Sequence, residues 1–258
     1  MMDRKLNVKW YKTIDSTNLQ AQREISQAEE GTVWTADFQT AGRGQRGNTW
    51  ESSRSLNLMF TILLRPSFLE AKEQFLISQI SALAVVNYLK TKGIDAKIKW
   101  PNDIYVGDKK ICGILIEHSI TGANLSASII GVGVNLNQTR FDSDAPNPTS
   151  LLLQANNLAP GDYENLKEYD RKEELASVLS QIMQLYLQLE NGGGEQIKAD
   201  YLSKMYRLGE YHKFIDLTAG EKIIEAKILG PDNYGCLILE TPDGSRNHYA
   251  FQQIRYIL

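Results

Sequence analysis

The feature that most constrains the fold is a glycine-rich segment that leads into a strand. Residues 42–47 (GRGQRG) have the G-x-G-x-x-G spacing of a dinucleotide-binding loop. In such a loop a helix begins at the third glycine, because the pyrophosphate lies at the helix N-terminus. Here residues 55–64 (SLNLMFTILL) follow instead, and their β-branched, aromatic and apolar side chains predict a buried strand. The segment therefore indicates neither a dinucleotide fold nor a Walker loop, since no Gly-Lys-Ser/Thr follows.

Strand-like segments dominate the first half of the chain. Periodicity and turn residues predict strands at 8–11, 32–38, 94–100 and 124–136, and a hairpin over 105–118. Helices are predicted from Ser16 or Thr17 to Gly31, and over 68–92 (amphipathic), 170–190 and 195–207. Because strands follow one another with few helices between them, we expect an α+β fold with a mixed or antiparallel sheet and helices on one side.

The sequence texture changes after Gly209. From there to the C-terminus, five or so short strand-like segments alternate with turn residues over about fifty positions. This pattern predicts two domains: residues 1–209 with the larger sheet, and residues 210–258 as a small SH3-like β-barrel.

Composition and charge exclude several classes of protein. The formal net charge is -3, so the surface as a whole has no electrostatic reason to bind nucleic acid. No apolar run approaches membrane-spanning length. Cys112 and Cys236 stand far apart without zinc-site spacing. The first residues show neither a signal sequence nor a helix-turn-helix, so we expect a cytoplasmic protein that does not bind DNA.

Arg43 and Arg46 in the glycine-rich segment indicate an anionic ligand. Glycines leave backbone N–H groups accessible, and guanidinium groups form paired hydrogen bonds with carboxylate or phosphate. We expect a loop that is mobile when empty and becomes ordered around an anion. The alternative, on the loop alone, is a surface hairpin tip with solvated arginines.

A second candidate group lies in the segment KWPND and the strand after it. Asp103 is suited to hold a magnesium ion or to orient a lysine, and Lys110, at the start of an apolar strand, to neutralise a phosphoryl oxygen. Gly113 permits a ligand to approach the backbone. Alternatively, Asn102 and Asp103 form a turn after a proline and the lysines are solvated, which is the interpretation we favour for Lys109.

A third candidate group is the segment GVGVNLN, residues 131–137. Glycines inside a strand indicate a bulge or a ligand close to the backbone. Asn135 is then suited to hydrogen-bond an adenine edge. The alternative is a tight twist of the strand, with Asn135 capping the following loop.

Taken together and in this order, the segments DSTN, QTAGRGQRGNTW, KWPND, KKICGIL and GVGVNLN resemble the biotin protein ligase family, the biotin–[acetyl-CoA-carboxylase] ligases. The resemblance covers most of residues 8–137, and the β-rich tail is similar to that family's small C-terminal domain. It implies the fold shared with class II aminoacyl-tRNA synthetases. It also implies ATP and Mg²⁺ as cofactors, biotin as substrate, and a biotin carboxyl carrier protein domain as partner. Biotinyl-5′-AMP would form first, and the biotin would then pass to a lysine of the carrier.

The resemblance also implies a set of site residues. Biotin would be bound by Ser16, Thr17, Gln39, Gly42, Arg43, Lys110 and Gly113. ATP or the adenylate would be bound by Trp50, Lys99, Asn102, Asp103 and Asn135, with Asp103 as the magnesium ligand. Lys110, Arg43 and Arg46 would be catalytic, with the two arginines in a loop that closes over the adenylate phosphate.

Two positions depart from the family pattern. Loops of that family commonly carry arginine where this chain has Gln45, and often where it has Asn48. Which arginine holds the phosphate therefore stays open, as does the choice between monomer and homodimer.

The rival functions are a lipoate protein ligase, a non-catalytic ligand-binding module and a nicotinamide-linked oxidoreductase. KWPND and the β-rich tail favour biotin over lipoate. The presence of Lys110 argues against a non-catalytic module, and the strand after Gly47 argues against an oxidoreductase.

Overall fold

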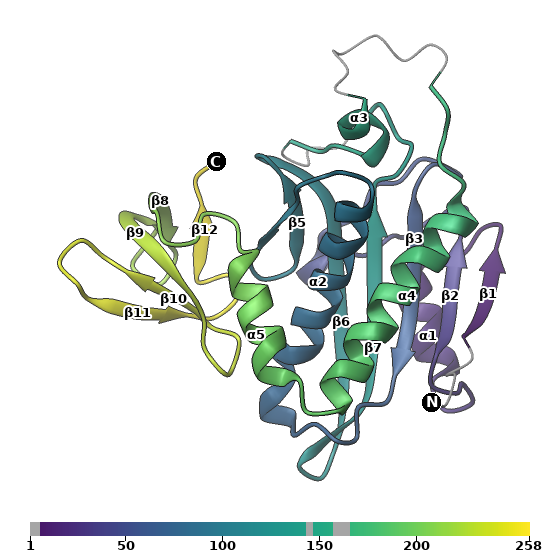
Figure 1. Cartoon of the computed structure of the whole chain (residues 1–258), viewed down its shortest axis with the longest axis horizontal. Coiled ribbons are helices and arrows are strands. Elements are labelled where there is room, and N and C mark those ends of the chain that lie inside the picture. The colour runs from purple at the N-terminus through teal and green to yellow at the C-terminus, as the bar shows by residue number, and fades with distance from the viewer. Residues whose placement is uncertain (1–5, 143–146, 157–165) are drawn as a thin grey trace.

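Two sheets form the framework of the chain (Figure 1). The computed structural model describes residues 6–142, 147–156 and 166–258, and the side chain of Arg46 lies outside this description. In these ranges the larger sheet has seven strands, in the order β1-β2-β3-β7-β6-β5-β4. They are β1 (Asn7–Tyr11), β2 (Thr32–Ala36), β3 (Leu58–Leu64), β4 (Lys97–Lys99), β5 (Asp103–Val106), β6 (Lys109–Thr121) and β7 (Asn124–Val134). β1 pairs with β2 in parallel and the other neighbours are antiparallel, which confirms the predicted mixed sheet.

Helices cover both faces of this sheet. They are α1 (Thr17–Glu24), α2 (Phe75–Thr91), α3 (Leu151–Ala155), α4 (Arg171–Glu190) and α5 (Gly194–Ser203), with short 3₁₀ turns η1 (Gln45–Gly47) and η2 (Ala71–Glu73). α2, α4 and α5 pack together on one face, in front of the sheet in Figure 1, and α1 lies behind it. The prediction of helices on one side therefore describes the three longer helices, while α1 covers the other face.

The alternation of side chains along β2 and β3 explains why both faces need a cover. Val33 and Ile62 belong to the main core, which α2 and α4 complete. Trp34 and Leu63, one residue further on, point to the opposite face and pack with Ala21 of α1. Both faces of these strands are thus apolar, and the two cores lie back to back.

Three helices differ from their predicted extent or character. α2 begins at Phe75 and is buried on nearly all sides, because it lies between the sheet and the helices α4 and α5. α1 ends at Glu24 instead of continuing to Gly31; a turn follows, in which the Gln27 and Ala28 N–H groups both donate to the Glu24 carbonyl. α3 was not predicted, although Ser150 caps it by accepting a hydrogen bond from the Leu153 N–H.

The second sheet begins at Tyr211 and confirms the β-rich C-terminal region. Its five strands run antiparallel in the order β11-β10-β9-β8-β12. They are β8 (Tyr211–Asp216), β9 (Lys222–Pro231), β10 (Leu237–Glu240), β11 (Arg246–Tyr249) and β12 (Ile254–Tyr256). Trp100 joins the two regions by donating its indole N–H to the Gly235 carbonyl at 2.9 Å. The division into domains at residue 209 stays a prediction.

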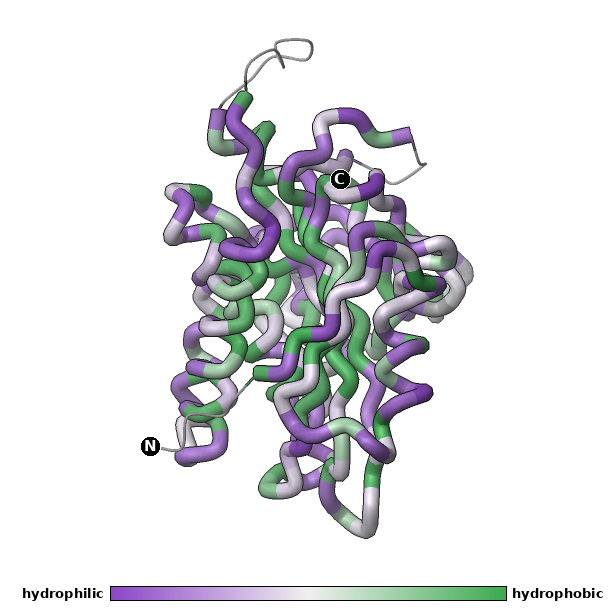
Figure 2. The backbone as a smooth tube through the Cα atoms, turned by 90° about the vertical axis from the view of Figure 1, so that its right-hand side faces the viewer, coloured by the Kyte–Doolittle hydropathy of each residue, from purple (hydrophilic) through white to green (hydrophobic). Residues whose placement is uncertain are grey.

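The hydropathy of the chain follows this arrangement. Figure 2 shows hydrophobic segments gathered in the central strands and the helices against them, with hydrophilic segments in the outer turns. Of the helices in the described ranges, none combines the length and the apolar character that crossing a membrane requires.

Candidate active site

A cavity of about 860 Å³ lies where the large sheet, the glycine-rich loop and the C-terminal strands meet. Ten of the residues proposed from the sequence line it: Ser16, Thr17, Gln39, Arg43, Trp50, Lys99, Asn102, Asp103, Lys110 and Gly113. Gly42 lies next to it in the loop, and Asn135 does not line it. The predicted role of Arg46 falls on a side chain outside the described part of the structure.

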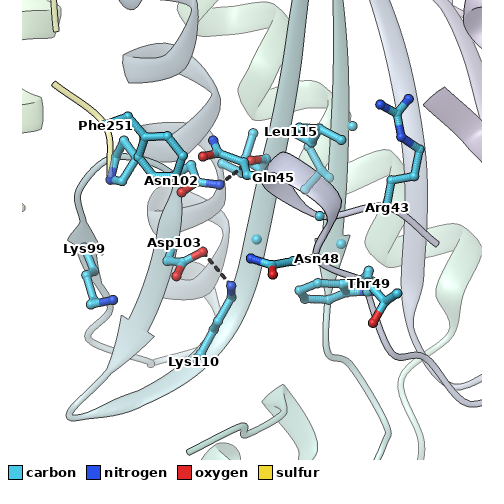
Figure 3. A pocket seen from close by; sticks show the side chains of 18 of the residues that line it. Arg43, Gln45, Asn48, Thr49, Lys99, Asn102, Asp103, Lys110, Leu115 and Phe251 are labelled. Carbon is cyan, nitrogen blue, oxygen red and sulfur yellow. Dashed lines mark hydrogen bonds and ion pairs between the residues drawn. The ribbon is translucent and has the colours of Figure 1, made fainter. Parts of the chain in front are cut away.

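The glycine-rich loop folds back on itself at the edge of this cavity. The Trp50 N–H donates to the Gly42 carbonyl at 3.0 Å, and the Gly44 N–H donates to the Asn48 carbonyl at 2.7 Å. Between them Arg43 and Thr49 form an antiparallel bridge. Figure 3 shows Arg43, Gln45, Asn48 and Thr49 around the pocket, so the loop is part of its wall and not a solvated hairpin tip.

One end of the cavity is polar and lies at the start of α1. The Thr17 N–H donates to Gln39 Oε1 at 2.7 Å, which fixes the orientation of that amide. Asn18 is buried beside Thr17, and its Oδ1 accepts a hydrogen bond from the Thr61 hydroxyl at 2.6 Å. Sequence reasoning named neither Asn18 nor Thr61 as site residues, although Asn18 stands in the DSTN segment.

Glycines form the floor of the cavity beneath Trp50. A Cβ atom placed on Gly133 would lie 2.5 Å from Trp50 Cε2, and one on Gly113 would lie 2.9 Å from Trp50 Cζ3. Within the described residues the buried Trp50 Nε1–H has no hydrogen-bond partner. The sequence predicted that a ligand would approach the backbone at these glycines. In the structure the group that lies close to them is the Trp50 indole of the loop.

Cationic groups gather at the opposite end of the cavity. Lys110 Nζ lies 2.6 Å from Asp103 Oδ1, and Figure 3 shows the two side chains pointing toward one another. Lys99 Nζ lies 4.9 Å from the ring centres of both Tyr105 and Tyr256. Burial lowers the pKa of the Lys99 ammonium, and the nearby charge of Asp103 does not offset it. This end thus holds two lysines and one acidic side chain, and an anionic ligand there would stabilise the charged form of both lysines.

Asp103 is the one acidic side chain among the described residues that line the cavity. The described residues contain no cluster of three or more His, Cys, Asp or Glu side chains that could hold a metal ion by itself. A single carboxylate nevertheless suits Mg²⁺, because this ion usually binds one or two carboxylates together with substrate phosphates and water. Asp103 therefore fits a magnesium ion that a nucleotide brings with it.

Two asparagine amides serve the scaffold. Asn102 lines the cavity, but its Nδ2 donates to the Ile114 carbonyl at 2.7 Å and so ties the turn before β5 to β6. Asn135 is buried outside the cavity, where its Nδ2 donates to the Thr149 carbonyl at 2.9 Å. The Asn135 Oδ1 has no hydrogen-bond partner among the described residues, so the role of this side chain at an adenine edge stays a prediction.

The C-terminal strands contribute residues that sequence reasoning missed. Phe251, Arg255 and Tyr256 line the cavity beside Lys99, and Figure 3 shows Phe251 next to Asn102 and Gln45. They stand in no recognisable motif, and only the docking of the second sheet brings them to the site.

Comparisons with known proteins agree with this geometry. The model of the biotin/lipoate A/B protein ligase family matches residues 10–135. The bifunctional ligase/repressor BirA of Bacillus spizizenii is 31% identical over 244 residues, which cover 93% of this chain and 71% of that protein. The biotin–[acetyl-CoA-carboxylase] ligase of Paracoccus denitrificans is 32% identical over 236 residues, which cover 89% of this chain and 92% of that protein.

A solved structure matches nearly the whole chain. It is the biotin protein ligase from Aquifex aeolicus in complex with biotin and ATP, with a TM-score of 0.78 and 29% sequence identity. The match covers 97% of this chain and 99% of that chain, so it includes both sheets.

Proposed function

The chain belongs to the biotin/lipoate A/B protein ligase family, and we propose that it is an ATP-dependent biotin protein ligase. It activates biotin as biotinyl-5′-AMP and transfers the biotin to a lysine. The observation that carries this function is the composition of one cavity: a polar end at Thr17 and Gln39, a glycine floor, and cationic groups at Lys110 and Lys99. Such a cavity suits an uncharged ring system at one end and phosphates at the other.

In the first half-reaction a carboxylate oxygen of biotin attacks the α-phosphorus of ATP. A new P–O bond forms, the bond from the α-phosphorus to the bridging oxygen breaks, and pyrophosphate leaves. The two reactants are both anions, and two unit charges about 4 Å apart repel by about 4 kcal/mol at an effective dielectric constant near 20. Lys110 lines this end of the cavity, where its ammonium can offset this repulsion.

In the second half-reaction a lysine amine attacks the carbonyl carbon of the mixed anhydride. An amide bond forms, the C–O bond to AMP breaks, and the amine gives up a proton. Water would compete for the same carbon, so the adenylate must be shielded. The loop from Gly42 to Trp50 supports this role, because it forms one wall of the cavity.

The roles of individual side chains form part of the proposal. Ser16, Thr17 and Gln39 would bind the polar ring of biotin, with backbone groups at Gly42 and Gly113 nearby. Trp50 would pack on the adenine, and Lys99, Asn102 and Asp103 would position ATP. Arg43 and Arg46 would belong to the closing loop. Asp103 would hold Mg²⁺, which supplies charge neutralisation on the phosphates.

The acceptor we propose is the carrier domain of a biotin-dependent carboxylase. This choice rests on the relative from Paracoccus denitrificans, whose name specifies acetyl-CoA carboxylase as the protein that it biotinylates. The cytoplasm is the proposed location, since both Cys112 and Cys236 are free thiols.

The nearest competing substrate is lipoate, because the family model includes lipoate ligases. Pyrophosphate release from ATP separates the two substrates. We expect biotin to stimulate release and lipoate to leave it at the background rate. Stimulation by lipoate, without stimulation by biotin, would assign the chain to the other branch of the family.

A further inference from the structure

Arg43 does not extend toward the cationic end of the cavity. Figure 3 shows its side chain pointing away from Lys110 and Asp103. Its Nη2 lies 3.4 Å from Oε1 of Glu117, which projects from β6 of the large sheet. The side chain of Arg43 thus links the glycine-rich loop to the sheet by an ion pair.

The second oxygen of Glu117 has a different partner. Oε2 accepts a hydrogen bond from Asn18 Nδ2 at 3.1 Å. A carboxylate can only accept hydrogen bonds, so the Asn18 amide must turn its NH₂ group toward Glu117. Its Oδ1 is then free to accept from the Thr61 hydroxyl, at 2.6 Å. The Leu115 carbonyl also accepts from this NH₂ group, at 3.4 Å, so Glu117 supplies the shorter of the two hydrogen bonds that orient a buried amide at the polar end of the cavity.

Asn18 has little freedom to adopt another position. A Cβ atom on Gly131 would lie 2.0 Å from Asn18 Oδ1, so the amide packs directly on the backbone of β7. Thr61 Oγ1 also lies 2.8 Å from Thr17 Oγ1, which connects this amide to the residues that hold Gln39. A change at Glu117 is thereby transmitted to the polar end without contact between Glu117 and a ligand.

We propose that Glu117 is a positioning residue with two tasks. One oxygen orients Asn18 at the polar end of the biotin site, and the other holds Arg43, and with it the loop, over that end. The ion pair between Arg43 and Glu117 then restrains the loop against the sheet, while Lys110 and Lys99 face the phosphates. This inference rests on the proposed function, since it assumes that biotin occupies the cavity.

Substitution by glutamine separates the two tasks. Glu117→Gln keeps an oxygen that can accept from Asn18, but it removes the charge that attracts Arg43. The side chains of Arg43 and Glu117 are 40% and 30% exposed, and ion pairs of this kind contribute little. We therefore expect biotin to dissociate about two- to fivefold faster, with kcat at saturating biotin little changed. High salt should abolish the difference, because it screens the pair in the unsubstituted chain.

Glu117→Ala removes both tasks and leaves the buried Asn18 NH₂ with only its longer hydrogen bond, 3.4 Å to the Leu115 carbonyl. We expect biotin dissociation to accelerate by about tenfold or more, and this effect should persist in high salt. Glu70→Gln is the matched control, since it removes an exposed ion pair with Lys72, away from the cavity. It should leave biotin dissociation unchanged, and thermal unfolding should verify that each variant is folded.

The experiment measures biotin dissociation from the full chain by stopped-flow tryptophan fluorescence, in low and high salt. It includes Arg43→Gln alone and combined with Glu117→Gln. If the ion pair restrains the loop, biotin dissociates from the double variant no faster than from the faster single variant. Additive effects, or unchanged dissociation in Glu117→Gln, would overturn the inference while leaving the ligase function in place. Failure of the unsubstituted chain to bind biotin would overturn both.

Discussion

At the scale of single residues, the absence of a Cβ atom at Gly133 allows the Trp50 indole to pack on the floor of the cavity. The indole of Trp50 lies directly against this glycine and against Gly113. A methyl group at Gly133 would come within 2.5 Å of the ring, closer than real Cβ contacts allow. Because the contact is with the body of a rigid ring, the indole must leave its position or the loop must shift.

We predict that Gly133→Ala weakens ATP binding by about tenfold, since displacing a packed aromatic ring costs about 1–3 kcal/mol. Tryptophan emission should also shift, because the half-buried Trp50 indole moves to a wetter position. Gly194→Ala is the control, since its Cβ would meet no atom closer than 3.8 Å. An alanine variant at Gly133 with unchanged emission and unchanged KM for ATP would contradict this account of the floor.

The sequence predicted the members of the cavity better than their contacts. Residue types suited to anions and to close backbone approach identified Lys110, Arg43 and Gly113, and all three line the cavity. Asn135 differs because an amide can serve a ligand or a backbone carbonyl equally well. Its partner, the Thr149 carbonyl, comes from a segment whose path the local sequence does not specify.

At the scale of elements, Glu24 fixes the end of α1 to the back of the large sheet. Its Oε2 accepts hydrogen bonds from Lys9 Nζ in β1 and from Trp34 Nε1 in β2. The Lys9 ammonium, helped by the Trp34 N–H, lowers the pKa of this carboxyl from 4.5 to about 2. The helix that carries Thr17 and Asn18 is thereby held on the sheet at its far end.

This contact predicts a pH dependence of stability. A carboxyl whose pKa is lower in the folded state stabilises the fold fully above its unfolded pKa, and the contribution is lost as the pH falls toward the folded value. Glu24→Gln should therefore reduce the free energy of unfolding by about 1 kcal/mol at pH 7, since the pair is partly exposed. The difference from the unsubstituted chain should shrink between pH 4.5 and about 2. Urea unfolding across this range measures it, and a difference independent of pH would contradict the assignment.

Element types were more predictable from the sequence than element ends. Most strands of both sheets lie in segments whose alternation or apolar run predicted them, whereas β5 begins two residues before the predicted hairpin and β12 was not predicted individually. The predicted end of α1 was wrong because the helical spacing of apolar residues continues through Ile25 and Ala28. These two residues pack on the second core, but they lie beyond the last residue of the helix. The prediction that α2 is amphipathic was wrong because α4 and α5 also pack on it. The sequence of a single helix does not show which other helices will cover it.

At the scale of the whole molecule, the C-terminal sheet completes the cavity. Tyr256 in β12 and Tyr105 in β5 both contact the Lys99 ammonium, each ring centre 4.9 Å from Nζ. These residues are far apart in the sequence, and only the packing of one sheet on the other brings them together. No local pattern could have predicted the contact, which is why the sequence placed the site in residues 1–209 alone.

We predict that Tyr256→Leu raises the KM for ATP about fivefold, because a cation–π contact of about 1 kcal/mol to Lys99 is lost. Biotin binding should change much less, since Thr17 and Gln39 lie at the other end of the cavity. Tyr211→Leu is a matched control, because Tyr211 makes the same kind of contact with Lys227 outside the cavity. Equal effects of the two substitutions on the KM for ATP would show that the C-terminal strands take no part in nucleotide binding.

The most direct test of the account is to incubate the chain with biotin, ATP and Mg²⁺ and to detect biotinyl-5′-AMP by mass spectrometry. The unsubstituted chain should form it, and a folded Lys110→Ala variant should form it at least a hundredfold more slowly, since a cation that offsets the repulsion in the transition state is missing. Formation of the adenylate at equal rates in both would remove Lys110 from the catalytic role. Its absence from the reaction of the unsubstituted chain would contradict the central claim that this cavity joins biotin to ATP.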